Sequence, residues 1–219
     1  VHYNKNNIKK LSDSIKSYFK NFNYENERIN SDNKKIIFIF GMPRSGTTIT
    51  ERIISNHSEV SSMGELGFTD YTINKDIIID FEINTDLIDS FYKKDFTKDY
   101  YKFTSYFKNN GSIIADKTLM NFWYIGFIKI FFPNAKFIHC FRNPKDNCLS
   151  IYKNLFDGEM GWGYDEEELA DYYNIYKDLM NFWNQEIDGE ILNLEYENLL
   201  KNSDLEIKKI IKFCDLEWE

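Results

Sequence analysis

Residues 36–48 restrict the possible folds of this chain more than any other segment. They begin with five consecutive apolar residues, 36–40, a run that predicts a strand buried on both faces of a sheet. Gly41 and Gly46 enclose a short loop, and Thr47 opens a segment with helical spacing of isoleucines. A strand, a glycine loop and a helix N-terminus form an anion-binding cradle, because unpaired N–H groups converge at the positive end of the helix dipole.

The two glycines have the spacing of a nucleotide-phosphate loop, but the residues after the second glycine differ. Nucleotide hydrolases place Lys followed by Ser or Thr there, to hold the outer phosphates and Mg²⁺. This chain has Thr47 and Thr48 instead, and its cation comes earlier, at Arg44. The loop therefore suits a nucleotide with one short anionic tail better than a magnesium triphosphate.

The segment GMPRSGTT at 41–48 resembles the 5′-phosphosulfate loop of sulfotransferases that use 3′-phosphoadenosine 5′-phosphosulfate (PAPS). It is similar above all to the loop of protein-tyrosine sulfotransferases and of bacterial sulfotransferases fused to tetratricopeptide repeats. The resemblance extends from about residue 36 almost to the C-terminus, through several motifs in order. It implies PAPS as co-substrate, with these loop residues as its ligands: Arg44, Ser45, Gly46, Thr47 and Thr48.

Two charged residues beyond the loop match catalytic positions of these families. Glu65 follows a short strand expected near 59–63, and Lys117 follows a buried strand near 112–115. The resemblance implies that Glu65 is the general base and that Lys117 contacts the sulfonyl group and the bridging oxygen. From the local residues alone, Glu65 is a solvated or helix-capping glutamate, and Lys117 is a surface lysine paired with Asp116.

A strand near 136–141 ends at Arg142, and Ser150 lies on the helix that follows. The resemblance implies that this pair is the 3′-phosphate clamp, which needs a fixed cation and a hydroxyl donor and distinguishes a PAPS user from an ATP user. Tyr196, in a Tyr-Glu-x-Leu turn, matches a residue that contacts the nucleotide, and a buried core tyrosine is an equal alternative. Asn154 departs from the pattern, because tyrosine sulfotransferases have arginine there.

The sequence predicts an α/β fold of the P-loop type, with a mostly parallel sheet and helices on both faces. The loop, Glu65, Lys117 and Arg142 all lie at or just after strand ends, where open α/β sheets place their sites. We expect a lead-in helix and linker over 1–35 and a sulfotransferase domain over 36–219 that lacks the nucleotide-covering C-terminal segment of its relatives. Five strands are expected, near 36–40, 59–63, 112–115, 136–141 and 190–194.

Composition excludes some partners and locations. The chain has 27 Lys and Arg against 35 Asp and Glu, a formal net charge of −8, which argues against nucleic acid as a partner. No apolar run approaches 20 residues and no signal-peptide pattern is visible, so we expect no membrane span and a cytoplasmic location. The three cysteines are widely spaced, which favours buried thiols over a metal site or a disulfide.

The resemblance implies transfer of a sulfuryl group from PAPS to the hydroxyl of an acceptor, without a metal. Glu65 would take the acceptor proton, while Lys117, Arg44 and loop N–H groups stabilise the leaving phosphate. Protein tyrosine, glycan, lipid and small-molecule acceptors all stay open. Residues 68–110, expected to form two or three helices, are the candidate region for acceptor recognition.

Two other functions stay open. A P-loop phosphotransferase is argued against by the missing loop lysine and by Arg142 with Ser150. A non-catalytic nucleotide-binding or interaction module is favoured by the missing C-terminal segment and argued against by the presence of Glu65 and Lys117.

Overall fold

The computed structural model describes residues 3–24, 35–107, 111–156 and 160–219. A sheet of five parallel strands forms the centre, in the order β2-β5-β1-β6-β7. This confirms the predicted fold class, and each strand lies within two residues of its predicted range. The strands are β1 Ile36–Phe40, β2 Val60–Ser62, β5 Ile113–Asp116, β6 Lys136–Phe141 and β7 Ile191–Glu195.

Helices fill the connections between the strands, and a small antiparallel hairpin is formed by β3 (Ile78–Ile79) and β4 (Glu82–Ile83). Two 3-10 helices are η1 (Leu119–Trp123) and η2 (Gly161–Tyr164). The α-helices are α1 Lys5–Phe19, α3 Thr47–Ser55, α4 Phe68–Ile77, α5 Thr85–Tyr92, α6 Phe96–Thr104, α7 Ile125–Phe131, α8 Pro144–Tyr152, α9 Glu166–Glu186, α10 Tyr196–Lys201 and α11 Ser203–Phe213.

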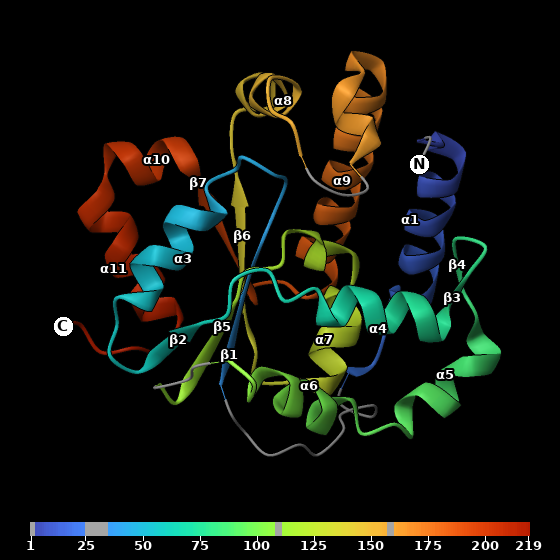
Figure 1. Ribbon diagram of the computed structural model, residues 1–219, viewed down its shortest axis with the longest axis horizontal. Helices are drawn as coiled ribbons and strands as arrows, with labels where there is room; N and C mark the ends of the chain where they lie inside the picture. The colour runs from blue at the N-terminus through green and yellow to red at the C-terminus, as the bar shows by residue number, and fades with distance from the viewer. Residues whose placement is uncertain (1–2, 25–34, 108–110, 157–159) are drawn as a thin grey trace.

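The side chains of β1 are shared between two hydrophobic cores. Successive side chains of a strand point to opposite faces, so Phe38 and Phe40 pack into one core with residues of α1, α7 and α9. Ile37 and Ile39 pack into a second core with residues of α3 and α11. All four side chains are fully buried. Figure 1 shows these two groups of helices on opposite sides of the sheet, as predicted.

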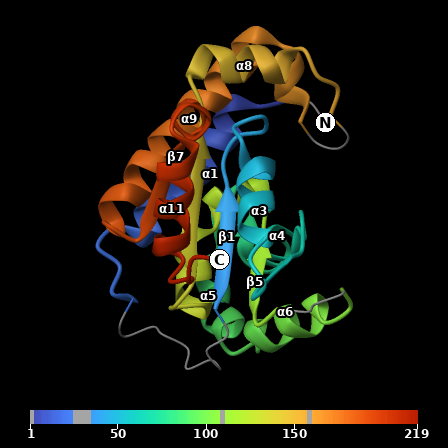
Figure 2. The same cartoon turned by 90° about the vertical axis from the view of Figure 1, so that its left-hand side faces the viewer.

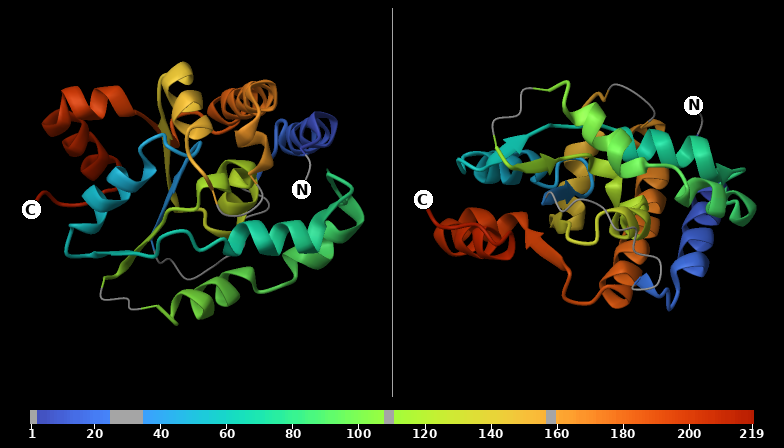
Figure 3. Two further views of the ribbon diagram at one scale, coloured as in Figure 1. Left: turned by 45° about the horizontal axis from the view of Figure 1, so that its top comes forward. Right: turned by 90° about the horizontal axis from the view of Figure 1, so that it is seen from below.

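The strands point in one direction, so their carboxyl ends gather at one edge of the sheet. In Figure 1 the arrow of β6 points toward α8 at the top, and in Figure 2 β1 runs toward the same helix. Figure 3 shows that α10 and α11 lie at one end of the molecule and α1 at the other. The carboxyl edge of the sheet, near α8, is therefore where a parallel α/β fold is expected to bind its ligand.

The predicted lead-in helix is α1, and it packs into the core of the following residues. Phe19 is fully buried and contacts Phe127 and Trp183 at centroid distances of 4.8 and 5.4 Å. Most of the predicted linker, residues 25–34, lies outside the described residues. No helix in the described part of the chain has both the length and the apolar character that crossing a membrane requires.

Two local predictions are corrected, and one element was not predicted. The largely apolar residues 121–132 before Pro133 predict one helix, but the structure has the 3-10 helix η1 first and becomes α-helical only at Ile125. The Tyr-Glu-x-Leu motif forms the helix α10 instead of a turn. The hairpin β3–β4 was not predicted, because Asp80 and Phe81 occupy its turn with positive φ, where sequence rules look for Gly or Asn.

Candidate active site

The loop between β1 and α3 forms the predicted anion cradle. Gly46 precedes α3 in a left-handed conformation, with φ +102°, and no side chain caps the first turn of this helix. The first N–H groups of a helix have no acceptor within it, so they are free to bind a ligand here. The hydroxyl of Ser45 is buried and has no hydrogen-bond partner among the described residues. These donors fit a phosphosulfate group.

Helix α8 holds this loop by two hydrogen bonds. Asn147 donates its Nδ2 hydrogen to the carbonyl of Pro43 at 2.8 Å, and Arg44 donates from Nε to Ser150 Oγ at 3.2 Å. Asn147 was missed by the sequence analysis, although it shares a helix face with Ser150 at a spacing of three residues. The hydroxyl of Ser150 thus contacts Arg44, and its shared role with Arg142 in a 3′-phosphate clamp stays a prediction.

Tyr196, the first residue of α10, packs directly on the loop. A Cβ atom at Gly46 would lie 2.7 Å from Tyr196 Cδ2, so only glycine allows this approach. The guanidinium carbon of Arg142 lies 5.1 Å from the centroid of the same ring, in cation–π geometry. Tyr196 is half-buried, so the alternative of a core tyrosine is wrong.

Arg142 follows β6 and is oriented by two groups. One is the Tyr196 ring, and the other is the carboxylate of Glu197, with Oε1 3.7 Å from Arg142 Nε. The same Glu197 oxygen accepts the N–H of Asn143 at 3.1 Å and so fixes the backbone after the strand. The Nε of Arg142 makes no hydrogen bond within the described residues, so the guanidinium keeps donors for a ligand.

Glu65 and Lys117 meet because β2 and β5 are paired. Backbone bonding continues past the strands, where Lys117 N–H donates to the carbonyl of Gly64 at 2.9 Å. Lys117 Nζ then reaches Glu65 Oε1 at 2.5 Å. The lysine side chain is 9% exposed and that of the glutamate 54%. The alternative pairing with Asp116 is wrong, because adjacent side chains of a strand point to opposite faces.

One cavity of about 470 Å³ collects most of the predicted residues. The three that do not line it are Ser45, in the loop itself, Lys117, bonded to Glu65, and Ser150, bonded to Arg44. The remaining wall is apolar and was not predicted, since Leu119, Phe156 and Met160 belong to no charged motif. The predicted residues in the lining are Arg44, Gly46, Thr47, Thr48, Glu65, Arg142 and Tyr196.

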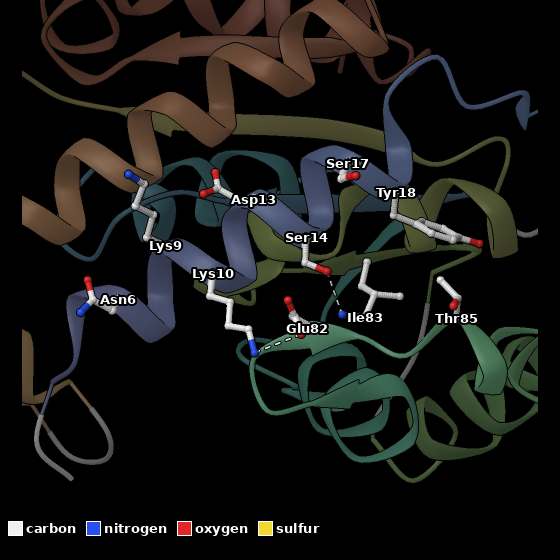
Figure 4. Close-up of a pocket in the computed structure, with 10 residues that line it drawn as sticks. All are labelled: Asn6, Lys9, Lys10, Asp13, Ser14, Ser17, Tyr18, Glu82, Ile83 and Thr85. Atoms are coloured by element: carbon white, nitrogen blue, oxygen red, sulfur yellow. Dashed lines mark hydrogen bonds and ion pairs between the residues drawn. The ribbon is translucent and has the colours of Figure 1, made fainter.

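A larger hollow of about 810 Å³ lies between α1 and the β3–β4 hairpin, away from every predicted site residue (Figure 4). Lys10 pairs with Glu82 at 3.0 Å across it, and Ser14 Oγ accepts the N–H of Ile83 at 2.9 Å. These bonds join the two walls, so the hollow is the open junction of two packed elements, and most of the predicted site residues line the smaller cavity instead.

Two buried titratable groups lie near the site without facing its cavity. Burial raises the pKa of Asp116 to about 6, against the hydrogen bonds from Thr118 and Tyr100 that lower it. Burial also lowers the pKa of His139 to about 4. His139 Nδ1 contacts Asn193 Oδ1 at 2.7 Å and the side chain is buried, so His139 is a core residue of β6.

Comparison with known proteins gives consistent results. A family model described as "Sulfotransferase family" matches residues 37–219. An uncharacterized protein of Aquifex aeolicus is 32% identical over 85% of this chain, and the chain spans only 26% of that relative's length. A Caenorhabditis briggsae protein named "Putative protein-tyrosine sulfotransferase" is 24% identical over 86% of this chain and 68% of its own length.

Solved structures show the same fold. The sulfotransferase domain of the Synechococcus PCC 7002 olefin synthase has a TM-score of 0.61 at 15% identity, covering 88% of this chain and 77% of its own. A sulfotransferase from Alicyclobacillus acidocaldarius has a TM-score of 0.57 at 16% identity, covering 85% of this chain and 82% of its own.

Proposed function

Since the chain belongs to the sulfotransferase family, we propose that it transfers a sulfuryl group from PAPS to the hydroxyl group of an acceptor. One observation carries the proposal: the phosphate loop, Glu65 and Arg142 line the same cavity, and Lys117 contacts Glu65 without lining the cavity itself. These groups follow four adjacent strands, β2, β5, β1 and β6. Such convergence at the carboxyl edge of a parallel sheet is typical of a ligand site.

The nucleotide end of the cavity is the part near the loop and Arg142. The unpaired Ser45 hydroxyl and the free N–H groups of α3 would hold the 5′-phosphosulfate, together with Arg44. Arg142, steadied by Tyr196 and Glu197, would hold the 3′-phosphate. The hydrogen bond from Arg44 to Ser150 supports a role for Ser150 in positioning the guanidinium of Arg44.

The reacting groups of the proposed mechanism are Glu65, which lines the cavity, and Lys117, which is bonded to Glu65. Bound PAPS would supply a sulfuryl group on a phosphate leaving group. Glu65, half exposed, would take the proton of the acceptor hydroxyl onto its carboxylate. Lys117, whose side chain is almost buried, would stabilise negative charge that develops on the leaving oxygen. Metal-free chemistry, a cytoplasmic location and the lack of a nucleic-acid partner belong to the same proposal.

The first test is calorimetric titration with adenosine 3′,5′-bisphosphate, the product that PAPS leaves behind. We expect a Kd on the order of micromolar for the unmodified chain and loss of at least tenfold in affinity for Arg142→Ala, because a charge-assisted contact is removed. The Glu65→Gln variant should bind as tightly as the unmodified chain. Tighter binding of ATP with Mg²⁺ would contradict the proposal and favour a phosphotransferase.

Turnover is then measured by the transfer of labelled sulfate from PAPS to tyrosine peptides, glycans and phenols. The name of the C. briggsae relative makes a tyrosine peptide the first acceptor to test. Glu65→Gln should lower kcat by 10²-fold or more, and addition of EDTA should have no effect. Bisphosphate binding without turnover on any acceptor class would favour a nucleotide-binding module instead.

A further inference from the structure

Glu65 lies on the loop 64–67, in which Leu66 packs against the main hydrophobic core and Glu65 points outward. Gly64 and Gly67 flank the segment, both with φ +63°, and a Cβ atom at either would meet nothing within 4 Å. The Glu65 side chain itself is half exposed. Apart from Leu66 and the contact with Lys117, hydrogen bonds at the two ends of the loop help to fix the position of this carboxylate.

The first end of the loop is bound to a buried glutamate of α3. Glu51 Oε1 accepts the N–H of Gly64 at 3.1 Å and the hydroxyl of Ser62 at 2.5 Å. Glu51 is buried and does not line the cavity. A single carboxylate oxygen thus fixes the end of β2 and the start of the loop to the helix that carries the phosphate cradle.

The second end of the loop is bound to a buried aspartate of β5 through a threonine. The N–H of Gly67 donates to Thr118 Oγ1 at 3.2 Å. Thr118 in turn donates to Asp116 Oδ1 from its hydroxyl at 2.7 Å and from its N–H at 3.0 Å. The other Asp116 oxygen accepts the hydroxyl of Tyr100, on α6, at 3.0 Å.

We infer that Glu51 and Asp116 are positioning residues, which fix the two ends of the 64–67 loop and so place Glu65 against Lys117. The inference rests on the proposed role of Glu65 as the base. A carboxylate buried without a cation is costly unless it accepts several hydrogen bonds. Burial raises the pKa of Asp116, and the charge of Glu51 adds to that rise. Two such groups, one at each end of the loop that carries the exposed Glu65, are explained if the loop must be held in one geometry.

The test compares Thr118→Val, which keeps the shape and removes the hydroxyl, with Thr118→Ser, which keeps the hydroxyl. The first readout is hydrogen exchange of the Gly67 amide, measured by NMR in the whole chain. We expect exchange to accelerate at least tenfold in Thr118→Val and to stay within about threefold of the unmodified chain in Thr118→Ser. This readout needs no activity. Unchanged exchange in Thr118→Val would overturn the inference.

The second readout is kinetic. In Thr118→Val we expect kcat to fall about tenfold or more with an unchanged Kd for adenosine 3′,5′-bisphosphate, because only the base is misplaced. Thr118→Ser should restore kcat. In the Glu65→Gln background the Thr118→Val change should have little further effect, since its action passes through Glu65. Faster exchange with an unchanged kcat would overturn the role in catalysis.

Glu51 offers an independent pair of variants, useful if Thr118→Val does not fold. Glu51→Gln keeps a carbonyl oxygen that can accept both hydrogen bonds, and Glu51→Ala removes it. We expect faster exchange of the Gly64 amide only in Glu51→Ala. If the unmodified chain transfers no sulfuryl group, the proposed function fails, and the exchange data alone decide whether the two carboxylates hold the loop.

Discussion

At Gly46 the absence of a side chain allows the ring of Tyr196 to pack on the phosphate loop. The ring of Tyr196 lies against its Cα, and the same ring orients Arg142. The residue also has a φ of +102°, which side chains other than hydrogen rarely tolerate. The lack of a Cβ atom at Gly46 therefore determines both the shape of the loop and, through the Tyr196 ring, the position of Arg142.

Gly46→Ala is expected to destabilise the fold by about 1–3 kcal/mol and to weaken bisphosphate binding about tenfold or more, because the Cβ displaces the Tyr196 ring. Urea unfolding and calorimetry measure the two effects. The matched control is Gly189→Ala, which also has a positive φ, +75°, but no atom within 4 Å of its Cβ. The control should lose stability alone. Equal loss of affinity in both variants would contradict the role of Tyr196.

Single residues also show where sequence patterns stop being informative. Lys117 is adjacent to Asp116 in sequence, yet it pairs with Glu65, which is 52 residues away. Strand geometry excludes the first pairing, but the second depends on which strand lies beside β5, and local residues do not encode that. Arg44 and Ser150, 106 residues apart, are likewise joined only by the packing of α8 on the loop.

At the scale of elements, α8 acts as the support of the phosphate loop. Asn147 is buried in this helix and holds the Pro43 carbonyl. The first turn of α8 is itself fixed by Asn143, whose Oδ1 accepts the N–H of Lys145 at 3.0 Å, and by Pro144 at its start. The loop geometry is thus determined by a helix that follows it by about a hundred residues.

Asn147→Ala should leave the Pro43 carbonyl buried without a donor, which costs about 1–3 kcal/mol of stability. Bisphosphate affinity should fall as well, because the loop loses one of its two bonds to α8. The control is Asn154→Ala, since within the described residues the Asn154 side chain donates to the Ser150 carbonyl, at 2.5 Å, and makes no bond to the loop. Thermal unfolding and calorimetry compare the two. Unchanged affinity in Asn147→Ala would show that the loop holds its shape alone.

The strands could be predicted because each is a short apolar run with a break at its end, and the parallel order follows from the helices between them. The hairpin could not, because its turn places Phe81 next to Asp80 with a positive φ, a conformation that a bulky residue rarely adopts. The apolar wall of the cavity, formed by Leu119, Phe156 and Met160, could not be predicted for another reason. A sequence pattern assigns apolar residues to the hydrophobic core, and only the packing shows which of them line a cavity.

At the scale of the whole molecule, two buried groups act on stability in opposite directions below neutral pH. The pKa of Asp116 rises from an ordinary 3.8 to about 6, so the folded state binds a proton first and gains stability as the pH falls from about 6 to about 4. The pKa of His139 falls from 6.5 to about 4, so the folded state resists protonation and loses stability as the pH falls from about 6.5 to about 4. Each effect amounts to roughly 3 kcal/mol.

Asp116→Asn removes the first effect and leaves the second. Relative to its own value at pH 7, the free energy of unfolding of this variant should fall by roughly 3 kcal/mol more at pH 4 than that of the unmodified chain. Urea unfolding at a series of pH values measures both curves. Parallel curves would mean that Asp116 is ionised in the folded state throughout this range.

The central place of β1 has a consequence for the synthesis of the chain. Ile36 pairs with Ile114, and Ile37 with Lys136, so both neighbours of β1 leave the ribosome long after it does. Until then its five apolar residues form an uncharged, unpaired strand of the kind that associates with other chains. The segment that later leads into the phosphate loop is therefore also prone to association with other chains while the protein is being made.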